Sequence, residues 1–251
     1  MSKPTIKSDA EIKLMAEGGK KLGKIKKALF NHIKPGVSAH ELEVLANKLI
    51  NESGGKSSFK EVSGYSWATC INVNDGVVHG IPHKSLVFNE GDVVSLDIGL
   101  IYKGYHTDTS ITKLLGNDPK NTKLLESGQR TLKKAIKAAR PGATIGDISR
   151  VFQTELEKDG LNPIRSLTGH GIGRKLHEAP LIPCYVSGSS DEKVKIVPGM
   201  ALAIEIMYTS GSHEVKIEPD GWTIRTRDGK ISALFEETVA ITSDGPIILT
   251  N

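Results

Sequence analysis

Cysteine is scarce in this chain: Cys70 and Cys184 are the only two among 251 residues. Two cysteines cannot build a disulfide framework or a zinc ribbon, and a reduced, cytoplasmic setting fits them best. A long uncharged apolar run is also missing, which excludes a transmembrane helix, and the lysine-rich start lacks the apolar core of a signal peptide. We therefore expect an intracellular globular protein that has no contact with a membrane.

A strong excess of one charge is missing too. The 33 basic and 29 acidic residues leave a formal net charge of +4. This excess is too small to predict nucleic-acid binding by itself.

Two stretches of the chain carry the same helical pattern, 106 residues apart. In each, a helical segment ends at Pro-Gly, and a Ser or Thr followed three residues later by an acid opens a second helix as a capping box. We interpret the pattern as an internal duplication within one domain over residues 1–251, with halves of roughly 8–115 and 116–251. Coincidence is the alternative. The matching segments are 8–33, Pro35-Gly36 and Ser38–Ile50 in the first half, and 121–139, Pro141-Gly142 and Thr144–Gly160 in the second.

Strand-like segments fill much of the rest of the chain. Helices beside such strands predict an α+β domain in which the helices flank a mainly antiparallel sheet. Besides the hairpin described next, the expected strands are Val62–His79, Ile164–Gly171, Met200–Tyr208, Glu214–Glu218, Gly221–Arg227 and Ala233–Ile241.

Residues 91–110 predict a β-hairpin that carries two aspartates, Asp97 and Asp108. A two-residue turn at Lys103-Gly104 would set Asp108 opposite Gly99, two positions from Asp97. Strands alternate faces with period 2, so both carboxylates would emerge on one face as diagonal neighbours. Two such carboxylates repel when buried unless a positive charge lies between them, and metal ions are the simplest solution. An exposed strand with two solvated aspartates is the alternative.

Three later segments each place a candidate metal ligand in a strand setting. His170 lies between glycines that let the backbone approach closely, and Glu205 is a lone carboxylate inside an apolar strand. Glu236 and Glu237 open the last apolar strand. One histidine with four carboxylates suits two divalent ions such as Mn, Fe, Co or Zn better than a thiolate zinc site.

With these residues in place, the chain resembles type I methionine aminopeptidases of the pita-bread, creatinase-like clan of M24 metallopeptidases, nearly end to end. That fold is a pseudo-symmetric pair of αβ halves, which agrees with the internal duplication. The resemblance rests on VNDGVVHGIP (73–82), the Asp97–Asp108 hairpin, TGHGIGRKLHEAP (168–180), Pro198-Gly-Met with Glu205, DGWTIRTRDGKISA (220–233) and FEETVAIT (235–242).

The resemblance implies a single catalytic domain with a dinuclear centre of two divalent metal ions. It implies that a metal-activated water attacks the first peptide bond and releases the N-terminal methionine of peptides and nascent chains. Besides binding metal, Glu205 would be the proton shuttle. His79 and His177 would contact the scissile amide, as a general acid and as groups that stabilise the developing charge. The implied metal ligands are Asp97, Asp108, His170, Glu205 and Glu236, with Asp108 and Glu236 bridging.

The side-chain pocket follows the family pattern less closely than the metal ligands do. Tyr65, Cys70 and Trp222 match pocket-lining positions. Val62, Ser66 and Leu176 stand where tyrosine, proline and phenylalanine are usual, and Phe59 or Trp67 would refill the space. Apolar pockets discriminate a methylene by only about 1–3 kcal/mol, so we expect a retained preference for methionine with broader tolerance.

Glu237 replaces a histidine that commonly follows the final ligand, which leaves open whether Glu236 or Glu237 faces the metal. Motif position favours Glu236, and strand alternation makes it improbable that both point inward. Two other functions stay open: a proline-directed aminopeptidase or dipeptidase of the same clan, and a non-catalytic pita-bread binding module.

The resemblance to bacterial-type enzymes also implies a monomer. The lysine-rich segment 20–34 has two interpretations. It is either a solvated helix face, which we favour, or a transient contact with ribosomal RNA.

Overall fold

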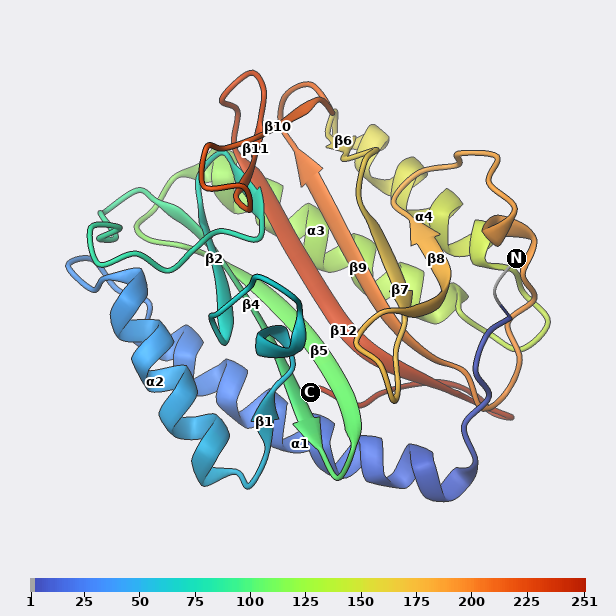
Figure 1. Ribbon diagram of the computed structural model, residues 1–251. Coiled ribbons are helices and arrows are strands. Elements are labelled where there is room, and N and C mark those ends of the chain that lie inside the picture. Colours follow the sequence, from blue (N-terminus) through green and yellow to red (C-terminus); the bar gives the residue numbers. More distant parts are fainter. Residues whose placement is uncertain (1–2) are drawn as a thin grey trace.

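The computed structural model describes residues 3–251, so the first two residues of the predicted domain lie outside the described part. Within residues 3–251, four α-helices flank a ten-stranded sheet, and a three-stranded sheet lies beside it (Figure 1). The helices are α1 (Asp9–His32), α2 (Ala39–Glu52), α3 (Pro119–Ala138) and α4 (Ile145–Lys158). The large sheet holds β1 (Lys56–Ser57), β2 (Thr69–Val73), β4 (Val93–Tyr102), β5 (Tyr105–Leu114), β6 (Asn162–Pro163), β7 (Thr168–Gly171), β8 (Glu178–Pro183), β9 (Ala201–Thr209), β12 (Ser232–Thr242) and β13 (Gly245–Ile248), and the small sheet β3 (Gly76–Val78), β10 (Val215–Ile217) and β11 (Ile224–Thr226).

The large sheet has the strand order β1-β4-β5-β12-β9-β7-β8, with β2, β13 and β6 paired to β4, β12 and β9. The paired strands run antiparallel throughout. The predicted α+β class with a mainly antiparallel sheet is therefore confirmed. At the centre of the sheet, β5 from the middle of the chain lies beside β12 from near its C-terminal end (Figure 1).

The predicted helix starts at Ser38 and Thr144 are confirmed by their caps. The Glu41 N–H donates to Ser38 Oγ at 3.2 Å, and the Ser38 N–H donates back to the Glu41 carboxylate at 2.9 Å. The Thr144 N–H donates to Asp147 Oδ2 at 2.8 Å in the same way. Each cap satisfies backbone donors that the helix itself leaves unpaired, a stabilisation of about 1 kcal/mol.

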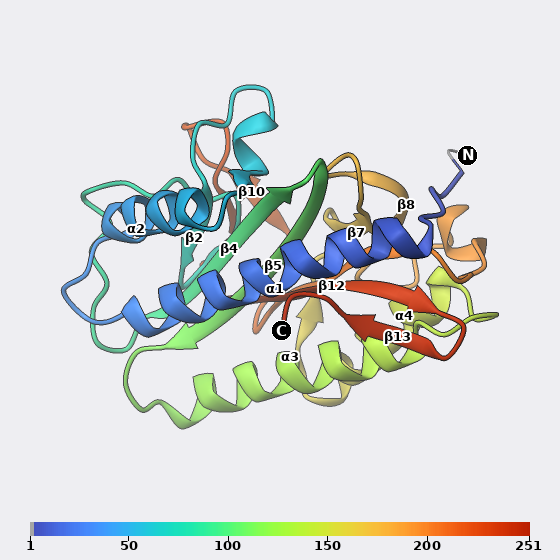
Figure 2. The same cartoon turned by 90° about the horizontal axis from the view of Figure 1, so that it is seen from below.

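Helices α1 and α3 lie against one face of the large sheet (Figure 2). Helix α1 packs on β4 and β5, and the hydroxyl of Tyr208 on β9 donates to the carbonyl of Leu124 on α3 at 2.7 Å. Tyr208 and Glu205 are an odd number of residues apart on β9, so their side chains leave opposite faces of the sheet. The helices thus bury the apolar face, and the face that bears Glu205 stays clear of α1 and α3.

Some expected strands are shorter in the structure. Of Val62–His79, only Thr69–Val73 and Gly76–Val78 are strands, and of Ile164–Gly171 only Thr168–Gly171. Where the loop meets β2, the backbone donates to a helix residue instead of to another strand: the N–H groups of Ala68 and of Thr69, the first residue of β2, donate to the buried Glu43 carboxylate on α2. Strands β1, β6, β8 and β13 were not predicted. Within the described chain, no helix is long and apolar enough to cross a membrane.

Candidate metal centre and cavity

The predicted hairpin is confirmed in its register. Tyr102 lies opposite Tyr105, and Asp108 lies opposite Gly99. Lys103 and Gly104 have φ values of 50° and 81°, the left-handed conformations that a type I′ two-residue turn requires. Asp97 and Asp108 therefore leave the β4–β5 ribbon on the same face, as expected.

The same register continues across the centre of the sheet. Asp97 lies opposite Ser110 on β5, and Ser110 lies opposite Glu236 on β12. Glu236 in turn lies opposite Glu205 on β9. His170 on β7 pairs with Ala203, two positions from Glu205 and therefore on the same face. Five neighbouring strands thus bring the five predicted ligands onto one face, and Ser110, which the sequence did not single out, lies among them.

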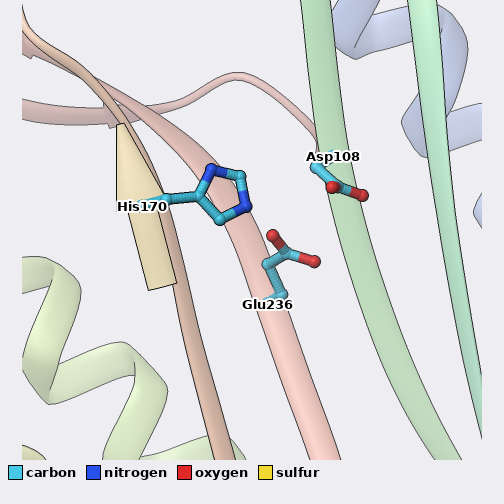
Figure 3. Close-up of side chains that lie close together, drawn as sticks. All are labelled: Asp108, His170 and Glu236. Atoms are coloured by element: carbon cyan, nitrogen blue, oxygen red, sulfur yellow. The ribbon is translucent and has the colours of Figure 1, made fainter. Parts of the chain in front are cut away.

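The side chains converge as well as sharing a face. One ligand atom from each of Asp108, His170 and Glu236 lies within 4.8 Å of the other two (Figure 3). His170 Nε2 is 3.7 Å from Glu205 Oε1. Asp108, His170 and Glu236 are buried, whereas Asp97 and Glu205 are partly exposed. The exposed alternative for the aspartate hairpin is thereby excluded for Asp108.

Burial and mutual repulsion make this cluster electrostatically unstable by itself. Burial raises the pKa of Asp108 to about 7, in spite of hydrogen bonds that favour its ionised form. The pKa values of Asp97, Glu205 and Glu236 are raised well above their usual range, by burial first and then by neighbouring carboxylates. Full ionisation of this cluster at neutral pH requires a positive charge among the carboxylates.

The donor set fits divalent cations. The buried Asp97 Oδ1 and Glu236 Oε1 have no hydrogen-bond partner among the described residues. Unsatisfied buried carboxylate oxygens are costly, and coordination would satisfy them. Four carboxylates with one imidazole is a ligand set for Mn, Fe, Co or Zn, and the two free cysteines lie outside it.

The glycines around His170 are required by the close spacing of β7 and its neighbours. A Cβ on Gly169 would lie 2.6 Å from the carbonyl oxygen of Ala203, and one on Gly171 would lie 2.2 Å from that of Ala179. His170 Nδ1 lies 2.8 Å from the Gly171 carbonyl, which can only accept, so Nδ1 carries the proton. Burial lowers the pKa of His170 to about 4, and the neutral ring presents its Nε2 lone pair to the carboxylates.

His79 and His177 line the cavity beside the cluster, and each is partly open to solvent. The His177 ring centroid is 4.5 Å from that of His170, and the His79 ring is 6.4 Å from Trp222. His79 has φ 58°, a conformation that costs energy for a non-glycine residue and often marks a functional position. Desolvation lowers the pKa of both rings, which favours neutral imidazoles at neutral pH.

A cavity of about 330 Å³ opens above the carboxylates. Tyr65 forms edge contacts with Trp222 at 5.0 Å and with Phe59 at 6.5 Å between ring centroids. The expected residues Phe59, Tyr65, Cys70, Leu176 and Trp222 all line it, as does Val62. Trp67 packs against Tyr65 at 5.2 Å instead of joining the lining, and Ser66 is an exposed loop residue.

Other lining residues were missed, because nothing in the sequence distinguished them from structural residues, although Val78 and Thr168 lie within segments that carry the resemblance. The missed residues are Val78, Leu181, Met207 and the segment 166–168. Met207 shares a face of β9 with Glu205, so strand alternation could have predicted that it lines the cavity.

Glu236 and Glu237 point in opposite directions, as strand alternation predicts. Glu236 lies with Asp108 and His170, whereas the Glu237 carboxylate accepts from Lys26 Nζ at 2.7 Å. The geometry thus agrees with motif position in favouring Glu236 over Glu237.

Comparison with known proteins agrees with this site. The model of metallopeptidase family M24 matches residues 13–243. The methionine aminopeptidase of Aquifex aeolicus is 40% identical over 250 residues, which cover 97% of each chain. The crystal structure of methionine aminopeptidase from Thermotoga maritima has a TM-score of 0.95 and 40% identity, covering 99% of this chain and 100% of that one. An Xaa-Pro dipeptidase from Bacillus anthracis has a TM-score of 0.76 and 23% identity, and the match covers 98% of this chain and 62% of that chain. At this identity the likeness shows the fold alone.

The chain belongs to metallopeptidase family M24, and within that family to the methionine aminopeptidases, with their pita-bread fold. Membership in a metallopeptidase family implies divalent metal ions, and the cluster of Asp108, His170 and Glu236 is a suitable place for them.

Proposed function

We propose that this protein removes the N-terminal methionine from peptides and nascent chains with a dinuclear metal centre. The observation that carries the proposal is the row of four carboxylates and one neutral imidazole on the floor of an apolar cavity. Asp97, Asp108, His170, Glu205 and Glu236 hold two divalent ions, which are Co, Mn, Fe or Zn. By the resemblance to methionine aminopeptidases, Asp108 and Glu236, which lie on the adjacent central strands β5 and β12, would be the ligands that both ions share.

When bound, the two ions supply Lewis-acid activation of a water and of the scissile carbonyl, and they hold the free α-amino group. The protein supplies a proton acceptor beside them. Glu205 lies next to His170 on the floor of the cavity, and its carboxylate would accept a proton from the attacking water and pass it to the leaving amine.

His79 and His177 act on the peptide bond itself. Both line the cavity, and their lowered pKa values keep them neutral at neutral pH. A neutral imidazole carries one N–H, which donates to the scissile carbonyl oxygen, or to the former amide nitrogen once the carbonyl carbon has become tetrahedral and that nitrogen has a free lone pair. These two donors stabilise the charge that develops as the carbonyl becomes tetrahedral.

The cavity wall accepts the side chain of the first residue. The Tyr65 hydroxyl donates to the Thr69 carbonyl at 2.9 Å, so Tyr65 offers its ring and not its polar tip. A thioether packs well among such aromatic edges. Phe59, Cys70 and Trp222 complete this part of the wall. Val62 and Leu176 line the cavity where tyrosine and phenylalanine are usual, and these smaller side chains support methionine preference with broader tolerance.

The rest of the proposal concerns organisation and setting. We propose one catalytic domain over residues 1–251 with halves of roughly 8–115 and 116–251, working as a monomer in the cytoplasm. Lys20, Lys24 and Lys27 are exposed on α1 and would make any transient contact with the ribosome. Cosedimentation with ribosomes at low and high salt tests that contact, and its absence at low salt removes it from the proposal.

Hydrolysis of a Met-Gly-Ser-Met peptide by metal-stripped protein, with Mn, Fe, Co or Zn added back, tests the activity. We expect metal-dependent release of the first methionine alone. Cleavage of a Xaa-Pro peptide instead would favour a proline-directed enzyme. Protein that binds metal but cleaves neither peptide would favour a binding module.

A further inference from the structure

Directly behind the proposed metal centre, on the other face of the same sheet, lies a buried ion pair. Lys26 on α1 places Nζ 2.7 Å from Glu237 Oε1, with 10% of the lysine side chain and 19% of the glutamate side chain exposed. Glu237 follows Glu236 on β12, so the two carboxylates leave the strand in opposite directions. Only the thickness of the strand separates this pair from the metal ligands.

Hydrogen bonds connect Lys26 to both central ligands through Thr109. Lys26 Nζ donates to Thr109 Oγ1 at 2.8 Å, and that hydroxyl donates to the backbone carbonyl of Glu236 at 2.9 Å. The Thr109 N–H donates to Asp108 Oδ1 at 3.0 Å. The lysine is therefore two contacts away from the backbone of one ligand and from the carboxylate of the other.

These contacts matter because β5 and β12 share little regular ladder. Their register includes only Glu236 opposite Ser110 and Glu237 opposite Thr109. Next to these pairs, the Thr238 hydroxyl accepts from the Asp108 N–H at 2.8 Å and donates to the Asp108 carbonyl at 2.7 Å. Side chains thus fix the spacing of Asp108 and Glu236 where backbone pairing ends.

We propose that Glu237 is a positioning residue for the metal centre: it neutralises Lys26, which links α1 to the β5–β12 seam, and thereby preserves the affinity of Asp108 and Glu236 for divalent cations. The inference rests on the proposed metal centre. An uncompensated ammonium behind the ligands repels a divalent cation, and an uncompensated carboxylate attracts it. The two halves of the pair therefore have opposite effects on metal affinity, which a purely structural role would not produce.

Calorimetric titration of metal-stripped protein with Co²⁺ measures whether each substitution raises or lowers the metal affinity. The absorption of bound Co²⁺ in the visible range reports the ligand geometry. We expect Glu237→Gln to raise the Kd for Co²⁺ about tenfold. Lys26→Met is expected to leave the Kd equal or lower. The double variant K26M/E237Q removes both charges and should return the Kd to within about twofold of the wild type.

Lys134 and Glu155, an ion pair whose lysine is more exposed than Lys26, provide a control. Lys134 Nζ lies 2.6 Å from Glu155 Oε2, and this pair joins α3 to α4 away from the cluster. Glu155→Gln should change thermal stability without changing the Kd. Unchanged affinity in E237Q, or equal loss in E237Q and K26M, would overturn the inference while leaving the proposed function intact. Wild-type protein that binds no Co²⁺ would overturn both.

Discussion

The floor and the wall of the cavity are built in different ways. The floor residues come from strands in continuous register. Asp97 and Glu236 each lie opposite Ser110, and Glu236 also lies opposite Glu205. The wall comes from segments that share no register: a 3₁₀ helix with Phe59, the loop with Tyr65, and the loop before β11 with Trp222. Strand register sets the floor residues opposite one another, whereas the wall segments are held by packing contacts and by isolated hydrogen bonds such as the one from Tyr65 to the Thr69 carbonyl.

The two regions also differ in what a substitution leaves behind. A change in the floor removes a charged ligand from the metal ions, which costs several kcal/mol of metal-binding free energy. A change in the wall alters only apolar volume, and apolar pockets discriminate by about 1–3 kcal/mol. The predictions below test this difference from the largest effect to the smallest.

Replacement of Glu236 by Gln should have the largest effect. We expect kcat/KM for a methionyl peptide to fall by about a thousandfold or more, with loss of bound metal, because a central ligand loses its charge. The metal-free variant should melt at a higher temperature than metal-free wild type, since one repelled buried carboxylate is gone. Glu52→Gln, at an exposed position of α2, is the control and should change neither value. Full activity and metal content in E236Q would falsify the floor assignment.

Replacement of His177 by Ala should have the next largest effect. We expect kcat to fall about a hundredfold while bound metal stays at the wild-type level, because the residue acts on the peptide and not on the ions. His79→Ala should behave alike. Steady-state kinetics with metal analysis measure both quantities. Loss of metal in parallel with activity would instead move His177 into the ligand set.

The stability of metal-stripped protein should depend on pH in a direction set by the floor. The folded-state pKa values of the four carboxylates lie above their unfolded values, with Asp108 at about 7. Folding therefore binds protons, and this contribution to stability is lost as pH rises through the folded pKa. The histidines have lowered folded-state pKa values, so they oppose this trend only below about pH 6.5, where unfolded histidine takes up a proton.

We accordingly expect the melting temperature of metal-stripped protein to fall by about 5 °C or more between about pH 6.5 and pH 8. Added Mn²⁺ or Co²⁺ should cancel most of that fall, because the cations balance the ionised carboxylates. Calorimetric scans of both forms provide the measurement. A metal-free protein that becomes more stable over this interval would contradict the electrostatics of the floor.

Truncation of Leu176 in the wall should have the smallest effect. Leu176→Ala enlarges the cavity, and we expect the preference for methionine over larger first residues to fall by about tenfold or less. The kcat for methionyl substrates should stay within about threefold of the wild type. A panel of peptides with varied first residues measures this, with Leu181→Ala at the more exposed part of the lining for comparison. Collapse of kcat for every substrate would show that the wall is as sensitive as the floor.

Much of the fold could be predicted because local rules govern it. Alternation and the Lys103-Gly104 turn predicted the hairpin register, and the capping boxes predicted where α2 and α4 begin. The sequence predicted a strand where the loop before β2 lies. This prediction was wrong because backbone N–H groups at the end of the loop donate to Glu43, a residue of α2 more than twenty positions earlier. Propensity within a segment carries no information about such a distant acceptor.

The sequence by itself determined which face of its strand each ligand would occupy, since alternation with period 2 is a property of the local backbone. It also determined that Glu236 and Glu237 would point apart. Only the tertiary structure decided that β5 and β12 would be neighbours, that Ser110 would join the row, and that Lys26 would reach Glu237 from 211 residues away. Burial of the apolar faces against α1 and α3 selects those neighbours, and that selection depends on the whole chain at once.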